Sequence, residues 1–284
     1  MEYINFFKAC LLFFKMKVMV NGLPGKMASE VVKQVLKSEG FELVPYALTG
    51  SDVNASSIKV GNLEIALVKP EAREDFIASI QKPEISVDYT HPSAVNSNAD
   101  FYCRHNLPFV MGTTGGDRTA LEQRVKDSEI VAVVAPNMAK QIVAFQAMMK
   151  YAADNFPTAF EGYSLEIAES HQKGKADTSG TAKAMVGYFN TLGIPFSVEQ
   201  IRMIRDPQQQ VAMGVPEEAL TGHGWHTYTL KSKEGSVLFR FIHNVNGREV
   251  YAAGTIDAIR YLSEKIAVGE KGKVYSMMDV LKGK

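Results

Sequence analysis

The densest group of reactive side chains lies between Glu169 and Ala182, in the sequence ESHQKGKADTSGTA. His171 and Lys175 are four positions apart, and Gly174 between them predicts a loop rather than a helix. A histidine and a lysine placed in this way can supply protons to a reacting dicarboxylate. The same residues are equally consistent with a basic surface loop that has no catalytic role.

The end of this segment predicts the beginning of a helix. Ser179, Gly180 and Thr181 precede apolar residues at helical spacing. Asp177 or Ser179 can cap that helix, and the backbone N–H groups near Gly180 and Thr181 would then attract an anion. An ordinary N-cap without a ligand is the alternative.

A second candidate site is the turn GLPGKMA at residues 22–28, directly after a short apolar strand. A dinucleotide-binding fold places its pyrophosphate at this turn, because glycine permits close approach and helix N–H groups attract anions. A GxxG spacing is also typical of a simple strand–helix turn, so its position after the first strand carries the prediction. The predicted cofactor-binding residues here are Gly22, Leu23, Pro24, Gly25, Lys26 and Met27.

The end of the second predicted strand bears on cofactor choice. The sequence there is LTGSD at 48–52, and the acidic residue expected near the strand end to bind a ribose hydroxyl is missing, because Thr49 follows Leu48. Thr49 and Ser51 can tolerate a 2′-phosphate, and Lys26 can add positive charge nearby. We therefore expect NADPH as the cofactor, with NADH as a possible substitute. A polar loop without cofactor contact is the alternative for Thr49 and Ser51.

Two more loops follow predicted strands and would border the same cleft. Each alone is as consistent with a turn as with a ligand contact. Their predicted cofactor-binding residues are Gly112, Thr113 and Thr114 in one loop, and Ala135, Pro136, Asn137 and Met138 in the other.

These sites require an α/β scaffold to position them. Strand-like and helix-like segments alternate in the first half of the chain, which predicts a doubly wound, Rossmann-like parallel sheet. The expected strands cover residues 17–20, 41–48, 63–68, 85–89, 109–111 and 130–134.

The pattern changes after Asn137. A long helix is expected at 139–155, followed by two-faced strands at 163–169, 225–230 and 237–243, which predict a mixed or antiparallel sheet. We expect an α+β domain for substrate binding and oligomerisation at 139–250. Residues 16–138 and 251–284 would form the dinucleotide-binding domain.

The bulk properties exclude several classes of function. The chain has 284 residues and a formal net charge of zero, which argues against nucleic-acid binding by bulk electrostatics. Its two cysteines and six histidines show no metal-ligand spacing, so we expect no metal site. The apolar run within residues 1–15 is too short to span a membrane, and we interpret it as an N-terminal extension.

Arg202 and Arg205 are assigned no role from the sequence. We interpret His223, Trp225 and His226 as a packing group at a strand edge.

Taken together, the motifs resemble those of the dihydrodipicolinate reductase family, from Met16 through nearly the whole chain. Four blocks occur in the family's order: GLPGKM at 22–27, GTTG at 112–115, APNM at 135–138 and ESHQKGKADTSGTA at 169–182. The resemblance implies hydride transfer from NAD(P)H to a small cyclic dicarboxylate in lysine biosynthesis, on two domains in a homo-oligomer (dimer or tetramer).

The resemblance also implies roles for individual residues. His171 falls on the family's catalytic histidine and Lys175 on its proton-donating lysine. Ser179, Gly180 and Thr181 fall on the turn that holds a substrate carboxylate. Gln172 replaces a second histidine found in many bacterial members, and the DTSGT stretch is one residue shorter than theirs. Both departures, with HTYTL at 226–230, resemble the plant-type branch.

Two rival functions remain open from the sequence. Another two-domain dehydrogenase, such as a semialdehyde dehydrogenase, would need a nucleophilic cysteine, and Cys103 has no suitable neighbours in sequence. A non-catalytic dinucleotide sensor is disfavoured because both His171 and Lys175 are present. We expect a cytoplasmic protein, with the plastid stroma as the alternative.

Overall fold

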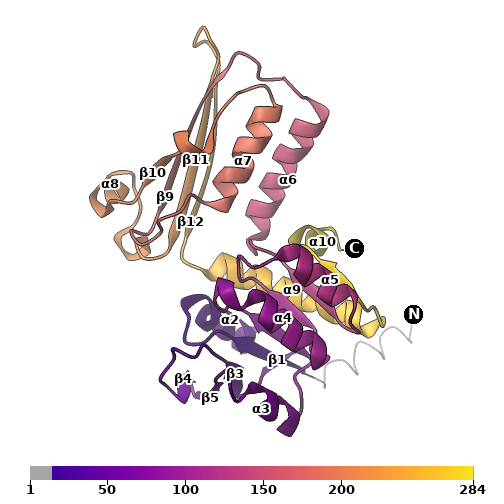
Figure 1. Cartoon of the computed structure of the whole chain (residues 1–284). Coiled ribbons are helices and arrows are strands. Elements are labelled where there is room, and N and C mark those ends of the chain that lie inside the picture. The colour runs from indigo at the N-terminus through magenta and orange to yellow at the C-terminus, as the bar shows by residue number, and fades with distance from the viewer. Residues whose placement is uncertain (1–14, 284) are drawn as a thin grey trace, which may run out of the picture. The chain divides into compact units, whose positions relative to one another are not determined.

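A computed structural model describes residues 15–283 of the chain (Figure 1). Apart from Lys15, the expected extension at 1–15 lies outside the described residues. The chain divides into two compact units. The first runs up to Lys140 and resumes at Tyr251–Lys284, and the second is Gln141–Val250. No helix among residues 15–283 is long and apolar enough to cross a membrane.

The first unit is built on a six-stranded sheet in the order β13-β8-β7-β6-β1-β2, and every pairing in it is parallel. Val18 and Met19 point to opposite faces and are both fully buried, as a sheet covered on two sides requires. The predicted doubly wound sheet is therefore confirmed. Its strands are β1 (Met16–Asn21), β2 (Phe41–Leu43), β6 (Ile85–Asp88), β7 (Phe109–Met111), β8 (Val131–Val134) and β13 (Lys273–Tyr275).

Amphipathic helices cover this sheet. On one face, Met19, Phe109 and Met111 share a buried cluster with Tyr102 of α4 and Leu121 of α5. These two helices lie in front of the sheet in Figure 1. The helices of the unit are α2 (Lys26–Lys37), α3 (Arg73–Ser79), α4 (Val95–Arg104), α5 (Arg118–Lys126), α9 (Glu249–Ala267) and α10 (Met277–Lys282).

The prediction of a single strand at 41–48 was wrong. Pro45 separates β2 from β3 (Tyr46–Leu48), and proline has no N–H group to continue a ladder. The β3 strand pairs instead with β5 (Leu63–Val68) in a second, three-stranded sheet with β4 (Ser57–Val60). The Leu48 amide donates to Asn21 Oδ1 at 2.8 Å, which joins the end of β3 to the end of β1.

The second unit is a mixed four-stranded sheet in the order β10-β9-β11-β12. The β9–β11 and β11–β12 pairings are antiparallel, whereas the short β10 runs parallel to β9. Helices α6 and α7 pack on one face, where Ile167, Tyr228 and Phe189 share a buried cluster (Figure 1). The elements are β9 (Ser164–His171), β10 (Arg202–Ile204), β11 (His223–Lys231), β12 (Leu238–Asn246), α6 (Lys140–Asn155), α7 (Gly180–Thr191) and α8 (Pro207–Ala212).

Candidate active site

The GLPG turn connects β1 to α2 in a conformation that favours glycine. Gly22 has φ +97°, and a Cβ there would lie 2.1 Å from the Tyr89 carbonyl oxygen. Helix α2 starts at Lys26, and the Gly25 N-cap supplies no side-chain hydrogen bond. The N–H groups of the first turn have no partners within the helix, so this turn fits an anionic pyrophosphate.

The three predicted cofactor loops follow parallel strands of one sheet. Gly22–Met27 follows β1, Gly112–Thr114 follows β7 and Ala135–Met138 follows β8, so all three lie at the carboxyl edge. Each loop was predicted separately from the sequence. The parallel pairing of β1, β7 and β8 within one sheet brings the three loops to this common edge. The residues predicted from the sequence to bind a dinucleotide therefore lie together in one unit.

The Thr49 side chain has a partner within the protein. Its hydroxyl donates to the Leu23 carbonyl oxygen at 2.6 Å, and the residue is buried. This hydrogen bond stabilises the GLPG turn, and the hydroxyl group has no second proton to donate to a cofactor. Any contact with a cofactor phosphate would have to come from other donors, such as Ser51 or Lys26, both of which are exposed.

A buried carboxylate, which the sequence argument missed, connects these loops. Asp88, at the end of β6, is fully buried and accepts from Tyr102 Oη at 2.7 Å and Thr113 Oγ1 at 2.5 Å. Tyr102 in turn accepts from Asn21 Nδ2 at 3.0 Å. Burial raises the pKa of the Tyr102 hydroxyl well above its usual value, so it stays a donor. An aspartate ending an otherwise apolar strand was the available sequence signal.

In the second unit, His171 ends β9 with its two ring nitrogens in different surroundings. Nδ1 lies 3.1 Å from the His223 carbonyl oxygen, which can only accept, so Nδ1 carries the proton. Nε2 is buried and has no hydrogen-bond partner in the described structure. Burial, followed by the nearby His226, lowers the pKa of His171 to about 4. His171 is therefore neutral at pH 7, with a lone pair available on Nε2.

Lys175 and the start of α7 occupy the loop that follows β9. Lys175 Nζ lies 2.6 Å from Asp177 Oδ1 in an ion pair. Ser179 is the N-cap of α7, and its side chain accepts from the Thr181 amide. Of the two candidate caps, Ser179 therefore serves, and Asp177 pairs with Lys175 instead. Gln172 accepts the Lys175 amide with its carbonyl oxygen at 3.0 Å, which closes a turn between them.

Glu169 and His226 complete this group of polar side chains, and neither was predicted from the sequence to take part in the site. Glu169 is fully buried and forms an ion pair with Arg205. Its Oε2 lies 3.7 Å from His226 Nε2. Burial opposes ionisation of Glu169, but His226, Arg205 and the Ser179 amide outweigh it and hold the pKa at about 2.

The interpretation of His223, Trp225 and His226 as a strand-edge group was wrong. They belong to β11, which lies inside the sheet between β9 and β12. His226 pairs across the sheet with Glu169, and Trp225 pairs with Ser170. Because successive strand residues face opposite sides, these two pairs lie on opposite faces of the sheet. His223 also bonds to Ser170 Oγ at 2.8 Å, on the side opposite His226.

Three possible metal ligands meet in this group, although their sequence spacing predicts none. One ligand atom each from Glu169, His171 and His226 lies within 4.8 Å of the others. The two Glu169 oxygens already accept from Arg205 and from the Ser179 amide. Because the Glu169 carboxylate is already engaged by these donors, we assign no metal to the group.

The buried histidines predict loss of stability in weakly acidic solution. Burial, followed by His226, lowers the pKa of His243 to about 3, and His171 is lowered to about 4. In the unfolded chain a histidine titrates near 6.5, so the unfolded state binds more protons below that pH. Stability is full above pH 6.5 and falls below it, by about 1 kcal/mol per histidine between pH 6.5 and 5.5.

Urea unfolding at pH 6.5 and 5.5 measures this loss. His243→Phe should make the loss smaller by about 1 kcal/mol, because one histidine with a lowered pKa is gone. His91→Gln, which changes an exposed histidine of the other unit, is the control and should leave the loss unchanged. Equal stability of the wild-type protein at both pH values would contradict the prediction.

These features define a class of protein. A doubly wound sheet with a glycine turn at its carboxyl edge, joined to an α+β unit that carries a His–Lys loop, is the architecture of a dinucleotide-dependent oxidoreductase. Comparison with known proteins identifies a particular family. Models of the dihydrodipicolinate reductase N-terminus and C-terminus match residues 16–138 and 141–281. The chain belongs to the dihydrodipicolinate reductase family, whose members are NAD(P)H-dependent oxidoreductases.

Individual relatives agree with this assignment. 4-Hydroxy-tetrahydrodipicolinate reductase 1, chloroplastic, of Arabidopsis thaliana is 47% identical over 269 residues, covering 93% of this chain and 77% of the relative. Reductase 2 of the same plant, also chloroplastic, is 47% identical over 269 residues, with the same coverage. The fold matches a dipicolinate-bound dihydrodipicolinate reductase from Paenisporosarcina sp. TG-14 with a TM-score of 0.65 at 22% identity, covering 93% and 98% of the two chains.

Proposed function

We propose that this protein reduces 4-hydroxy-tetrahydrodipicolinate with NADPH in the diaminopimelate route to lysine, using His171 and Lys175 as its catalytic residues. The observation that carries the proposal is the match of both halves of the chain to one reductase family. Plant relatives at 47% identity bear that enzyme's name. The His–Lys loop and the capped turn of α7 supply the chemistry that such a reaction needs.

The residues of the chain divide the chemical work between them. The three loops at the carboxyl edge of the first sheet would hold the cofactor, which would supply the hydride, and the 4-hydroxyl group of the substrate would leave as water in the net reaction. Lys175 carries the positive charge that stabilises developing negative charge on the substrate, and it donates the proton. His171 is neutral and adds no positive charge, so its Nε2 serves as a hydrogen-bond acceptor toward substrate or Lys175. The Ser179–Thr181 turn binds a substrate carboxylate, and the Gln172 side-chain amide can donate a further hydrogen bond.

A substrate-dependent assay of NADPH oxidation tests the proposal, with substrate made in situ from pyruvate and aspartate semialdehyde. We expect oxidation only when both precursors are supplied. Tight NADPH binding without turnover would favour a sensor. Reduction of NADP⁺ by aspartate semialdehyde in the absence of pyruvate would favour a semialdehyde dehydrogenase. Cys103 is buried in α4, and burial raises the pKa of its thiol, which disfavours a nucleophilic role.

Cofactor preference is a separate prediction. Thr49, rather than an acidic residue, directly follows β3, and Lys26 and Ser51 are exposed near that edge. We expect kcat/KM to be at least threefold higher with NADPH than with NADH in initial-rate measurements. Lys26→Ala should reduce that ratio, because it removes positive charge available to a 2′-phosphate. Equal rates with both cofactors would contradict this prediction.

We also propose that the second unit forms a homo-oligomer, either a dimer or a tetramer. Helices α6 and α7 cover one face of its sheet, whereas Leu238 and Ile242 of β12 are 57% and 56% exposed on the other. The β12 strand is also nine residues long and lies at the sheet edge, which offers unpaired backbone groups.

Light scattering during size-exclusion chromatography measures the oligomeric state. The wild-type protein should elute as a dimer or tetramer, and Ile242→Glu should shift it toward the 31.3 kDa monomer, because a buried unpaired carboxylate opposes association. Lys233→Glu, in the exposed turn before β12, is the control for added negative charge. A monomeric wild-type protein would contradict the proposal.

The proposed compartment is the plastid stroma, the alternative to the cytoplasm that the sequence left open. The two plant relatives described above are both named chloroplastic, which supports this choice.

A further inference from the structure

A buried ion pair lies beneath the loop that carries Lys175. Arg205 Nη2 donates to Glu169 Oε1 at 2.5 Å, and the side chains are 17% and 0% exposed respectively. Glu169 belongs to β9, an inner strand, and Arg205 directly follows β10, which runs beside β9. Both partners therefore stand on the framework of the sheet rather than on the loop itself.

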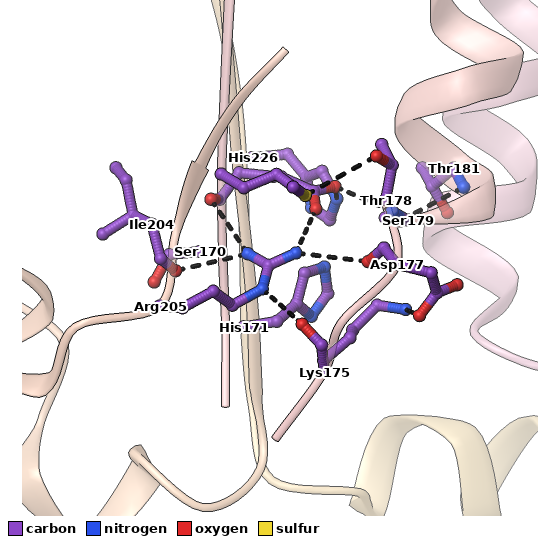
Figure 2. Close-up of polar contacts among 12 residues, drawn as sticks. Ser170, His171, Lys175, Asp177, Thr178, Ser179, Thr181, Ile204, Arg205 and His226 are labelled. Carbon is purple, nitrogen blue, oxygen red and sulfur yellow. Dashed lines mark hydrogen bonds and ion pairs between the residues drawn. The ribbon is translucent and has the colours of Figure 1, made fainter. Parts of the chain in front are cut away.

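Arg205 also donates to the main chain on both sides of this pair (Figure 2): Nη1 bonds to the strand carbonyl oxygens of Glu169 at 3.4 Å and Ile204 at 3.2 Å, and two further bonds reach the loop. Its Nε donates to the Lys175 carbonyl oxygen at 2.8 Å, and Nη2 reaches the Asp177 carbonyl oxygen at 3.3 Å. The guanidinium group is planar and presents its donors in a fixed fork, so these bonds fix direction as well as distance. The backbone at Lys175 is thereby connected to the sheet through one side chain.

Glu169 holds the other end of the same loop. Its Oε2 accepts from the Ser179 amide at 3.0 Å, immediately before the first residue of α7. One ion pair thus contacts both the residue that carries the ammonium group and the residue that starts the helix. The loop at 172–178 is thereby held at Lys175 and Asp177 by Arg205, and just beyond its end, at Ser179, by Glu169.

A second side chain also connects the ends of β9 and β10. Gln210 of α8 is buried and donates to the carbonyl oxygens of His171 at 2.7 Å and Ile204 at 3.1 Å. This side chain connects the end of β9 to the end of β10 independently of Arg205. The bonds from Arg205 to Lys175 and Asp177 serve the loop in addition.

We propose that Arg205 and Glu169 are positioning residues for the reaction, which hold Lys175 and the Ser179–Thr181 turn at a fixed separation. This inference rests on the proposed roles of Lys175 and of that turn. A dicarboxylate substrate bound by the turn would then present its reacting atoms to the Lys175 ammonium group in one orientation, and misplacement by about 1 Å can cost about 100-fold in rate.

A double-mutant cycle tests the inference. Steady-state kinetics are compared for the wild-type enzyme, Arg205→Lys, Lys175→Ala and the double variant. Arg205→Lys keeps the charge but loses the fork, so kcat should fall at least tenfold while KM for NADPH stays within twofold. In the Lys175→Ala background the same change should alter kcat by less than threefold, because its effect acts through Lys175.

The matched control is Arg202→Lys, three positions earlier on β10 and exposed, which should leave kcat within twofold of the wild-type value. An Arg205→Lys effect below threefold, or an equal loss in both backgrounds, overturns the positioning role alone. Near-normal turnover of Lys175→Ala overturns the proposed catalytic role of Lys175 itself, so the two failures are distinguishable.

The Glu169→Gln variant tests the contact between Glu169 and the Ser179 amide. It takes the place of Arg205→Lys if that variant does not fold. It is isosteric and leaves the bonds from Arg205 to the loop carbonyls in place. We expect KM for the substrate to rise at least fivefold, with KM for NADPH within twofold and an unchanged oligomeric state. A folded Glu169→Gln variant with wild-type KM for the substrate would overturn the role of Glu169.

Discussion

Lys175→Ala is expected to lower kcat by at least tenfold and to leave KM for NADPH within about twofold. Lys175 is the positively charged member of the His–Lys pair, because the pKa of His171 is lowered to about 4 and that ring is neutral at pH 7. Removal of the ammonium group removes both a proton donor and the charge that stabilises the transition state. Losses of about 10²–10⁴-fold are typical for such a group.

The measurement is steady-state reduction of substrate made in situ, followed through NADPH absorbance. Lys173→Ala is the matched control, since Lys173 lies in the same loop and is exposed. That variant should keep kcat within twofold of the wild-type value. His171→Ala should also lose at least tenfold, through loss of the Nε2 acceptor. If Lys175→Ala and His171→Ala both turn over normally, the catalytic assignment is wrong.

Gly22→Ala should have the largest effect on the cofactor side. A Cβ at this position would lie 2.1 Å from the Tyr89 carbonyl oxygen and 2.6 Å from its carbon, and φ is +97°. Because the obstructing atoms are backbone, either the GLPG turn or the segment after β6 must move. We expect a loss of at least about 2 kcal/mol in stability, which corresponds to about 4 °C or more in Tm.

The same displacement should raise KM for NADPH at least tenfold, because the pyrophosphate turn would leave its position at the start of α2. Thermal unfolding and initial rates with varied NADPH measure the two effects. Gly40→Ala is the control: φ is +84° and a Cβ there meets no atom within 4 Å, so it isolates the cost of backbone conformation. Gly22→Ala with the Tm and KM of that control would contradict the argument.

Local sequence patterns predicted the fold class because they record burial. Alternation of apolar strands with helices indicated a parallel sheet covered on both faces, and Val18 and Met19 are buried on opposite sides of β1. The break within residues 41–48 was missed even though Pro45 was visible. An apolar run shows that residues are buried but not which sheet buries them, and β2 and β3 belong to different sheets.

The segment 169–182 shows how far local chemistry reaches. The order of residue types around His171, Lys175 and Ser179 predicted a loop followed by a capped helix, and Ser179 does cap α7. Capping and turn formation depend on residues within a few positions of one another, so a single sequence contains the necessary information.

The sequence by itself determined the class of fold, the order of the motifs and the residue types in the His–Lys loop. The tertiary structure alone decided which side chains support that loop. Arg205 lies 36 positions from Glu169, and His226 meets Glu169 only because β11 pairs with β9 in one register. The protonation state of His171 likewise depends on burial and on His226, because a pKa responds to charges and solvent in space, which neighbours along the chain do not specify.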